Sequence, residues 1–136
     1  MESISNPKPS ISILVVEDEF ITLEFLVIIL TRKFPDAAIH KANNGRAGLE
    51  LFKSHLPDVV ITDINMPEMG GVQMADKIRT IKPDIKFIAL SSCPEKLILP
   101  DSSEKEFVFD HYIDKPIDHH GLFEAIEQCL GEIAQQ

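Results

Sequence analysis

Short runs rich in Val, Ile and Phe alternate with segments of helical spacing along almost the whole chain, and no other feature limits its fold as strongly. The length and composition of the short runs indicate β-strands. The runs at 13–16 and 59–61 are continuously apolar, as expected of strands covered on both faces. The alternation predicts βα units with right-handed crossovers and a parallel sheet with helices on both faces. The expected strands span 11–16, 38–41, 59–62, 86–90 and 107–113.

The segments between these strands carry apolar residues at helical spacing. The expected helices span 19–33, 44–55, 71–81 and 118–133. Asn44 and Asp118 are the expected N-caps of the second and the last of them. The stretch 94–106 differs, because Pro94 and Pro100 flank only five residues there and disfavour a regular helix. We therefore expect an irregular fourth helix.

Charged and polar side chains stand at the ends of the expected strands. Glu17 and Asp18 follow the first strand, and Asp63 follows the third. In an open parallel sheet, chemistry collects in the crevice beyond the carboxyl ends of the strands, so these carboxylates should converge. Three close carboxylates repel one another unless a cation is present, and Mg²⁺ fits because it needs few protein carboxylates. Ser91 and Lys115 would add a donor and a cation, a set that can stabilise a phosphoryl group on an aspartate.

The same positions argue against two other α/β functions. A flavodoxin-like nucleotide site needs a loop rich in Gly, Ser or Thr after the first strand, because its N–H groups bind the phosphate. This chain has carboxylates there, which attract a metal and repel an anion. A haloacid-dehalogenase-type phosphatase carries a second Asp two residues after its nucleophile, whereas this chain has Asn65.

The strand-end motifs together resemble the receiver domain of two-component response regulators. They occur in that family's order and read VEDE at 16–19, DINMP at 63–67, IALSS at 88–92 and YIDKP at 112–116. The resemblance covers residues 11–133. It implies a doubly wound α/β fold, flavodoxin-like in outline, with a five-stranded parallel sheet in the order 2-1-3-4-5.

The resemblance also implies how the chain handles phosphate. Asp63 would accept a phosphoryl group from a phosphohistidine on a sensor histidine kinase or a phosphotransfer protein. Asp18, Asp63 and the backbone carbonyl of Asn65 would bind Mg²⁺ directly, and Glu17 would bind it through water. Lys115 would pair with the phosphoryl group.

Further residues are implied to switch the surface or to set the lifetime of the phosphorylated state. Ser91 would be the hydroxyl that moves to the phosphoryl oxygen, and Tyr112 the aromatic switch that turns inward. Asn65 and Cys93 would tune how readily water attacks the acyl phosphate. The bond between Lys115 and its following proline is expected to be cis, at the modest cost that such a bond allows.

Composition restricts the partners and the domain count. The chain has 136 residues, so we expect one receiver at 11–133 with short tails at 1–10 and 134–136. A net charge of −9 disfavours nucleic acid and anionic membranes as partners of the whole surface. The first ten residues lack the apolar core of a secretory signal, and the longest apolar run, 25–30, is far shorter than the roughly 20 residues of a membrane span. We expect a cytoplasmic location.

The helix expected at 19–33 is apolar on nearly every face, including Val27 and Ile28. A helix on a two-layered α/β domain should leave about half of its circumference polar. The first alternative is a deeply packed helix with a few surface apolar residues. The second is a surface for a partner or for a homodimer, and the resemblance implies that the partner is the helices of the kinase or phosphotransfer protein. We favour the second.

The sequence thus predicts a stand-alone receiver that switches a surface for a downstream protein target and is not an enzyme with a diffusible substrate. The same sequence features would be found in a receiver cut from a larger regulator. Two alternatives stay open. One is a receiver-like binding module that acts without phosphorylation, and the other is a small Mg²⁺-dependent phosphatase.

Overall fold

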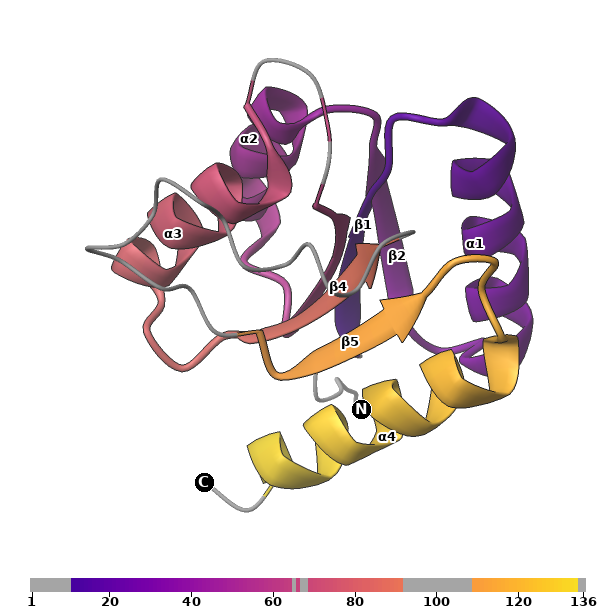
Figure 1. Ribbon diagram of the computed structural model, residues 1–136. Helices are drawn as coiled ribbons and strands as arrows, with labels where there is room; N and C mark the ends of the chain where they lie inside the picture. Colours follow the sequence, from indigo (N-terminus) through magenta and orange to yellow (C-terminus); the bar gives the residue numbers. More distant parts are fainter. Residues whose placement is uncertain (1–10, 65, 67–68, 92–108, 135–136) are drawn as a thin grey trace, which may run out of the picture.

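A computed structural model describes residues 11–64, 66, 69–91 and 109–134 (Figure 1). In these ranges strands and helices alternate as far as the fourth strand, and a fifth strand and a last helix follow among residues 109–134. The elements are β1 (Ser12–Val16), α1 (Phe20–Lys33), β2 (Ala38–Ala42), α2 (Gly45–His55), β3 (Val59–Asp63), α3 (Gly71–Ile81), β4 (Lys86–Ser91), β5 (His111–Asp114) and α4 (His119–Ala134).

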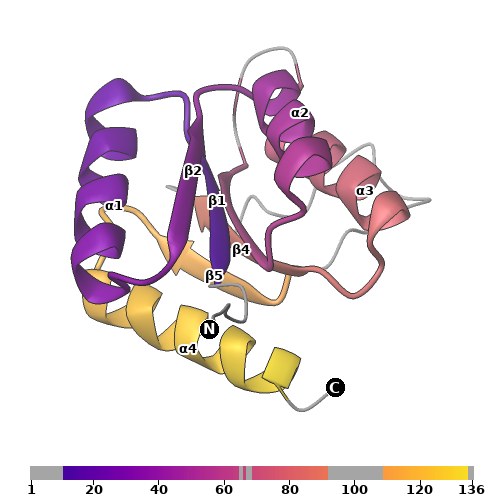
Figure 2. The same cartoon turned by 180° about the vertical axis from the view of Figure 1, so that it is seen from behind.

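The five strands form one parallel sheet in the order β2-β1-β3-β4-β5. Helices α1 and α4 cover one face of the sheet, and α2 and α3 cover the other (Figures 1 and 2). This confirms the predicted doubly wound sheet and its strand order. The order places β1 beside β3, so the residues that follow these two strands emerge next to each other.

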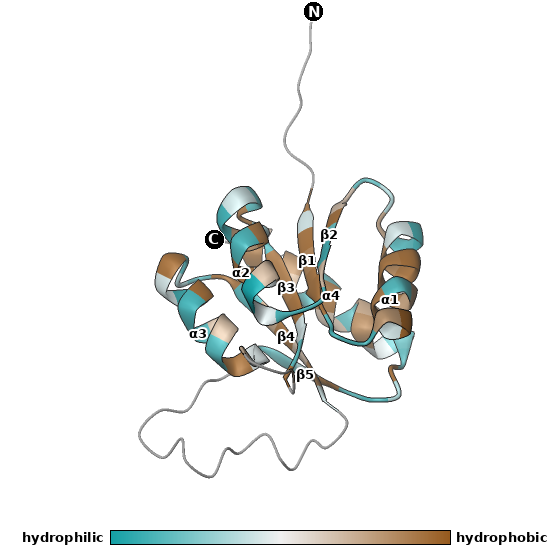
Figure 3. Cartoon of the chain, turned by 90° about the horizontal axis from the view of Figure 1, so that it is seen from above, coloured by the Kyte–Doolittle hydropathy of each residue, from teal (hydrophilic) through white to brown (hydrophobic). Residues whose placement is uncertain are grey.

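Each face of the sheet has its own apolar core. In β1, Ile13 and Val15 pack toward α1 and α4, whereas Leu14 and Val16 pack toward α2 and α3. Successive strand residues point to opposite faces, so a strand buried on both sides must be apolar throughout. The hydropathy colouring shows the apolar central strands enclosed by the helices (Figure 3).

The helix ends agree with both predicted N-caps. The Asn44 side chain accepts a hydrogen bond of 2.8 Å from the Ala47 N–H and caps α2. Asp118 accepts one of 3.4 Å from the His120 N–H at the start of α4. Helix α1 begins one residue later than predicted, because Glu19 takes the cap position with extended backbone.

The predicted start of the fifth strand is wrong. We expected a strand over 107–113, but Phe109 and Asp110 lie outside β5, which runs from His111 to Asp114. Phe109 is buried with its ring against Phe87 at 6.0 Å between centroids. Asp110 receives the Phe87 N–H on its carboxylate at 2.8 Å and donates its own N–H to the Phe87 carbonyl at 3.0 Å. These residues therefore pack and bond against the N-terminal end of β4, and they do not extend the pairing of β4 with β5.

Three further predictions concern segments that lie outside the described residues or at their end. The irregular helix at 94–106 and the tail at 1–10 lie outside them. Ala134, which was expected in the C-terminal tail, is the last residue of α4. Among the described residues, no helix combines the length and the apolar character that crossing a membrane requires.

Two glycines show how tightly α3 sits on the carboxyl end of β3. A Cβ on Gly71 would collide with the Asp63 carbonyl oxygen and would lie 2.9 Å from the Ile64 Cα. The Gly71 N–H also donates to the Ile64 carbonyl at 3.0 Å. Gly131, in α4, has nothing within 4 Å of the same position.

This contrast predicts opposite effects of the same substitution. Gly71→Ala should destabilise the fold by about 1–3 kcal/mol, because the backbone of β3 or α3 must shift. Gly131→Ala should stabilise it by about 0.5–1 kcal/mol, because alanine loses less entropy in a helix. Urea unfolding of both variants measures the difference, and a Gly71→Ala protein as stable as the parent would contradict the close contact.

Candidate functional site

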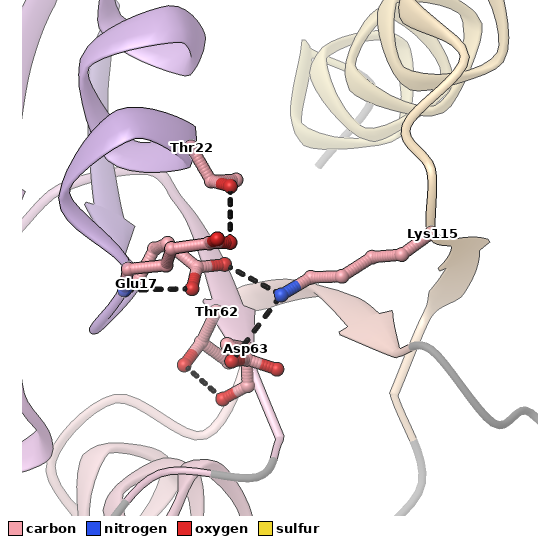
Figure 4. A network of polar contacts seen from close by, with 6 residues as sticks. Glu17, Thr22, Thr62, Asp63 and Lys115 are labelled. Atoms are coloured by element: carbon pink, nitrogen blue, oxygen red, sulfur yellow. Dashed lines mark hydrogen bonds and ion pairs between the residues drawn. The ribbon is translucent and has the colours of Figure 1, made fainter.

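The carboxyl ends of three strands bring together two acids and a lysine (Figure 4). Glu17 directly follows β1, Asp63 is the last residue of β3, and Lys115 directly follows β5. Glu17 and Asp63 are buried, with 0% and 5% of their surface exposed. The Lys115 side chain reaches across the edge of the sheet toward both carboxylates. Its Nζ lies 2.9 Å from Glu17 Oε1 and 3.4 Å from Asp63 Oδ2.

Glu17 is held at both its backbone and its side chain. Its N–H donates to the Ala42 carbonyl at 3.1 Å, which ties it to the end of β2. Its Oε2 accepts the Glu19 N–H at 3.0 Å, at the start of α1. The Glu19 carboxylate instead accepts the Thr22 hydroxyl at 2.6 Å. Glu17 therefore both faces the site and binds the N–H of the residue that caps α1, as expected for an acid at a helix N-terminus.

The backbone of Asp63 is fixed by its neighbours in the sheet. Asp63 pairs with Leu90, and the next N–H, of Ile64, donates to the Leu90 carbonyl at 3.2 Å. The Thr62 hydroxyl donates to the Asp63 carbonyl at 2.9 Å. Thr62 was not among the predicted site residues, and its place directly before Asp63 was the only signal for it. The carboxylate thus projects from a rigid strand end, not from a loop.

Lys115 and Ser91 are joined through the backbone. The Lys115 N–H donates to the Ser91 carbonyl at 2.8 Å, which continues the pairing of β4 with β5. The peptide bond between Lys115 and Pro116 is cis, as predicted. Ser91 ends β4 and is 3% exposed, so it lies at the same edge of the sheet as Asp63.

Tyr112 lies apart from this cluster. It stands in β5, paired with Ala89, and 44% of its surface is exposed. Its hydroxyl accepts the Phe109 N–H at 3.2 Å, and its ring meets the Phe109 ring at 5.8 Å. The described structure therefore has Tyr112 turned outward. Asn65 and Cys93, the two residues expected to tune the lifetime, lie outside the described residues.

Comparisons with known proteins agree on one family. The response regulator receiver domain model matches residues 13–127. Over 123 residues the chain is 30% identical to the chemotaxis protein CheY of Bacillus subtilis, covering 88% of this chain and 97% of CheY. It is also 30% identical to the uncharacterized transcriptional regulatory protein YesN of the same organism, covering 91% of this chain but only 33% of YesN. This chain belongs to the response regulator receiver domain family.

Solved structures lead to the same family. The response regulator TrrA of Thermotoga maritima, crystallised in complex with Mg²⁺-BeF, superimposes on this receiver domain with a TM-score of 0.74 at 32% identity. The match covers 88% of this chain and 98% of TrrA. The signal receiver domain of an HD domain-containing protein from Pseudomonas fluorescens has a TM-score of 0.82 at 24% identity, and it supports the fold alone.

The acidic cluster of this receiver domain suits a hard divalent cation. One carboxylate oxygen from each of Glu17, Asp18 and Asp63 lies within 4.8 Å of the other two. Oxygen ligands of this kind match Mg²⁺, which keeps several of its waters. The buried Glu17 Oε1 meets the Lys115 ammonium as an ion pair but has no well-oriented hydrogen bond among the described residues. An oxygen of this kind can still serve a cation or a bound water.

The pKa values of Glu17 and Lys115 are both raised at the site. Burial raises the pKa of Glu17, and the contact with the Lys115 ammonium and the hydrogen bond from the Glu19 N–H only partly offset it. Burial lowers the pKa of Lys115, but contact with Glu17 and the negative charge of Asp63 outweigh it, so this pKa is raised overall. Lys115 therefore stays charged. In the metal-free site, the Glu17 carboxylate binds its proton more tightly than a glutamate exposed to water does.

The raised pKa of Glu17 predicts a pH dependence of stability without metal. Native Glu17 binds its proton more tightly than unfolded Glu17, whose pKa is near 4.5. The free energy of unfolding should therefore fall as the pH rises from the unfolded pKa through the higher native one. Glu17→Gln should remove this decline, whereas Glu50→Gln on the exposed face of α2 should keep it. Urea unfolding in EDTA across this pH range measures it, and an unchanged decline in Glu17→Gln would contradict the assignment.

Proposed function

We propose that this receiver domain accepts a phosphoryl group on Asp63 and thereby switches a surface that a protein target binds. The proposal rests mainly on the position of the Lys115 ammonium, 3.4 Å from Asp63 Oδ2, beside a cluster of three carboxylates. A lysine and a cation site flanking one strand-end aspartate are what a phosphorylated aspartate requires, because the added group carries negative charge.

In this proposal a carboxylate oxygen of Asp63 attacks the phosphorus of a phosphohistidine on a sensor histidine kinase or a phosphotransfer protein. The new O–P bond forms as the P–N bond breaks, and the imidazole leaves with the electron pair of that bond. Lys115 contacts a phosphoryl oxygen, and the Ser91 hydroxyl donates to another. Asp18, Asp63 and the Asn65 carbonyl would hold Mg²⁺, with Glu17 bound through water. When bound, the ion would neutralise charge on the phosphoryl oxygens.

The proposal makes the domain a phosphoacceptor that modifies itself, and not an enzyme that turns over a diffusible substrate. Its downstream target would be another protein. The predicted unit at 11–133 includes every strand of the sheet, so phosphorylation and switching would take place within one domain. Asn65 and Cys93 remain the proposed residues that set the lifetime of the phosphorylated state.

The proposed switch connects Ser91 to the exposed face of β5. Ser91 ends the strand that pairs with β5, and its carbonyl already holds the Lys115 N–H at 2.8 Å. Movement of Ser91 toward a phosphoryl group would therefore act directly on β5. An inward turn of Tyr112 would break its contact with the Phe109 N–H and change the exposed surface of that strand.

The central test is phosphorylation by a small donor. With Mg²⁺ and radiolabelled acetyl phosphate, the parent protein should incorporate label, and Asp63→Asn should incorporate none, because the amide cannot attack phosphorus as a carboxylate does. Asp84→Asn, in the exposed turn before β4, is the matched control and should incorporate label normally. Intact-protein mass spectrometry measures the added phosphoryl group.

The same assay decides between the proposal and its alternatives. Asp63-dependent labelling without turnover supports the phosphoacceptor. A protein that binds its target but is never labelled would instead be a constitutive binding module. Sustained release of phosphate from unrelated esters would indicate a phosphatase, and either of these results would overturn the proposal.

The role of Lys115 can be separated from metal binding. Lys115→Met should slow labelling of Asp63 by roughly 10²–10³-fold, the usual cost of losing one group that stabilises transition-state charge. Mg²⁺ affinity should stay the same or increase, because a positive charge has left the cluster. Lys86→Met is the control, since Lys86 pairs with Glu132 at the opposite end of β4 at 3.1 Å. Labelling kinetics and Mg²⁺ titration measure both effects, and equal losses in both variants would contradict the role.

A further inference from the structure

Helix α1 has two apolar faces, one buried and one exposed. The buried face consists of Leu23, Leu26 and Leu30. The exposed face carries large apolar side chains, and the exposed fractions are 71% for Phe20, 77% for Ile21, 43% for Phe25 and 54% for Ile28. Exposed apolar side chains that gather on one helix are a mark of an interaction surface.

The spacing on the exposed face is that of a helix-packing seam. Ile21, Phe25, Ile28 and Arg32 follow one another at steps of four, three and four residues. This is the alternation with which two helices interlock side chains along their length. The seam covers about 16 Å at 1.5 Å per residue, and its apolar centre is Phe25 and Ile28. A neighbouring helix is therefore the occupant that fits it best.

Grooves continue the exposed face on both sides. Toward the phosphoacceptor site a groove is lined by apolar residues that include Ile21, Phe25 and Ile117, together with polar and charged residues that include Lys115. Toward α4 a second groove is lined by Phe25, Ile29 and Phe123 together with cationic residues. Phe25 borders both grooves, so the apolar surface is continuous across the helix.

Charge is distributed unequally along this helix. Asp18 and Glu19 precede its first turn, and Arg32 and Lys33 stand in its last turn. Lys33 lies 3.8 Å from Glu127, but Arg32 has no ion pair within the described ranges. Two such helices side by side in the same direction would place their cations together. In opposite directions, the acidic end of each would meet the basic end of the other.

We propose that a second copy of this chain packs along α1 in the opposite direction, about a two-fold axis near Phe25 and Ile28. In this arrangement Phe25 of one copy lies against Ile28 of the other. Arg32 lies against Ile21 of the other copy and reaches toward its Asp18 and Glu19. A C2 dimer needs one patch that is complementary to itself, and α1 has this property in the spacing of its seam residues and in its charge.

The whole-chain charge of −9 opposes any such pairing, since two copies repel each other at long range. Burial of the apolar seam and the local contacts of Arg32 must outweigh this repulsion. The dimer should therefore become tighter as moderate salt screens the long-range term, because the apolar contribution is not screened.

The first test is sedimentation velocity over a series of protein concentrations. The parent should show a concentration-dependent dimer. Ile28→Glu should weaken it by at least about tenfold, or about 1.4 kcal/mol, because the seam would bury an unpaired charge. Ile81→Glu is the matched control, since Ile81 is 45% exposed but lies at the end of α3. A parent protein that sediments as a monomer at every concentration would overturn the proposal, as would a dimer that Ile28→Glu leaves intact.

A charge exchange separates a second copy from an unrelated partner helix. Arg32→Glu and Glu19→Arg should each weaken self-association, and the double variant should restore much of it, because the two charges face each other across the axis. Failure of the double variant to recover would contradict the antiparallel pairing. Circular dichroism checks that each variant is folded, and these surface exchanges decide the question even if Ile28→Glu is unfolded. Labelling of Asp63 by acetyl phosphate is measured separately, so loss of the dimer and loss of phosphorylation are distinct results.

Discussion

The contact of the Lys115 ammonium with two buried carboxylates is the interaction on which the rest of the site depends. Glu17 and Asp63 are removed from water, and a buried charge is costly unless a partner of opposite charge compensates it. Lys115 supplies that partner from a different strand, at 2.9 Å and 3.4 Å. The two buried carboxylates share this compensating charge, which β5 holds in place, so the position of β5 is as important to the site as that of β3.

The order of the strands explains why three distant parts of the sequence meet. Val16 pairs with Thr62, so the residues that follow them, Glu17 and Asp63, emerge side by side. The pairing of β4 with β5 then brings Lys115 to the same edge. The close contact of Gly71 with the end of β3 fixes the height of α3 above that edge. A helix set further away would leave the Asp63 backbone room to move.

Much of this could be predicted, because strand ends are visible in the sequence. The parallel sheet and the convergence of Glu17, Asp18, Asp63 and Lys115 follow from apolar runs and the residues after them. The strand order follows from the resemblance of these motifs to receiver domains. The start of β5 could not, because an apolar residue such as Phe109 is equally suited to pairing and to packing, and only the contact with Phe87 decides. Periodicity likewise could not sort the apolar residues of α1, since one set at helical spacing faces the core and another faces solvent.

The balance of charge at the site suggests how one event could act on the whole edge of the sheet. Lys115 now divides its contact between Glu17 and Asp63. A phosphoryl group on Asp63 would add negative charge within reach of the same ammonium, and one ammonium cannot approach three anionic groups equally closely. Glu17 would then need another positive partner, which a divalent cation in the acidic cluster can provide. Metal binding and phosphorylation would therefore favour each other, because each relieves the charge that the other leaves unbalanced.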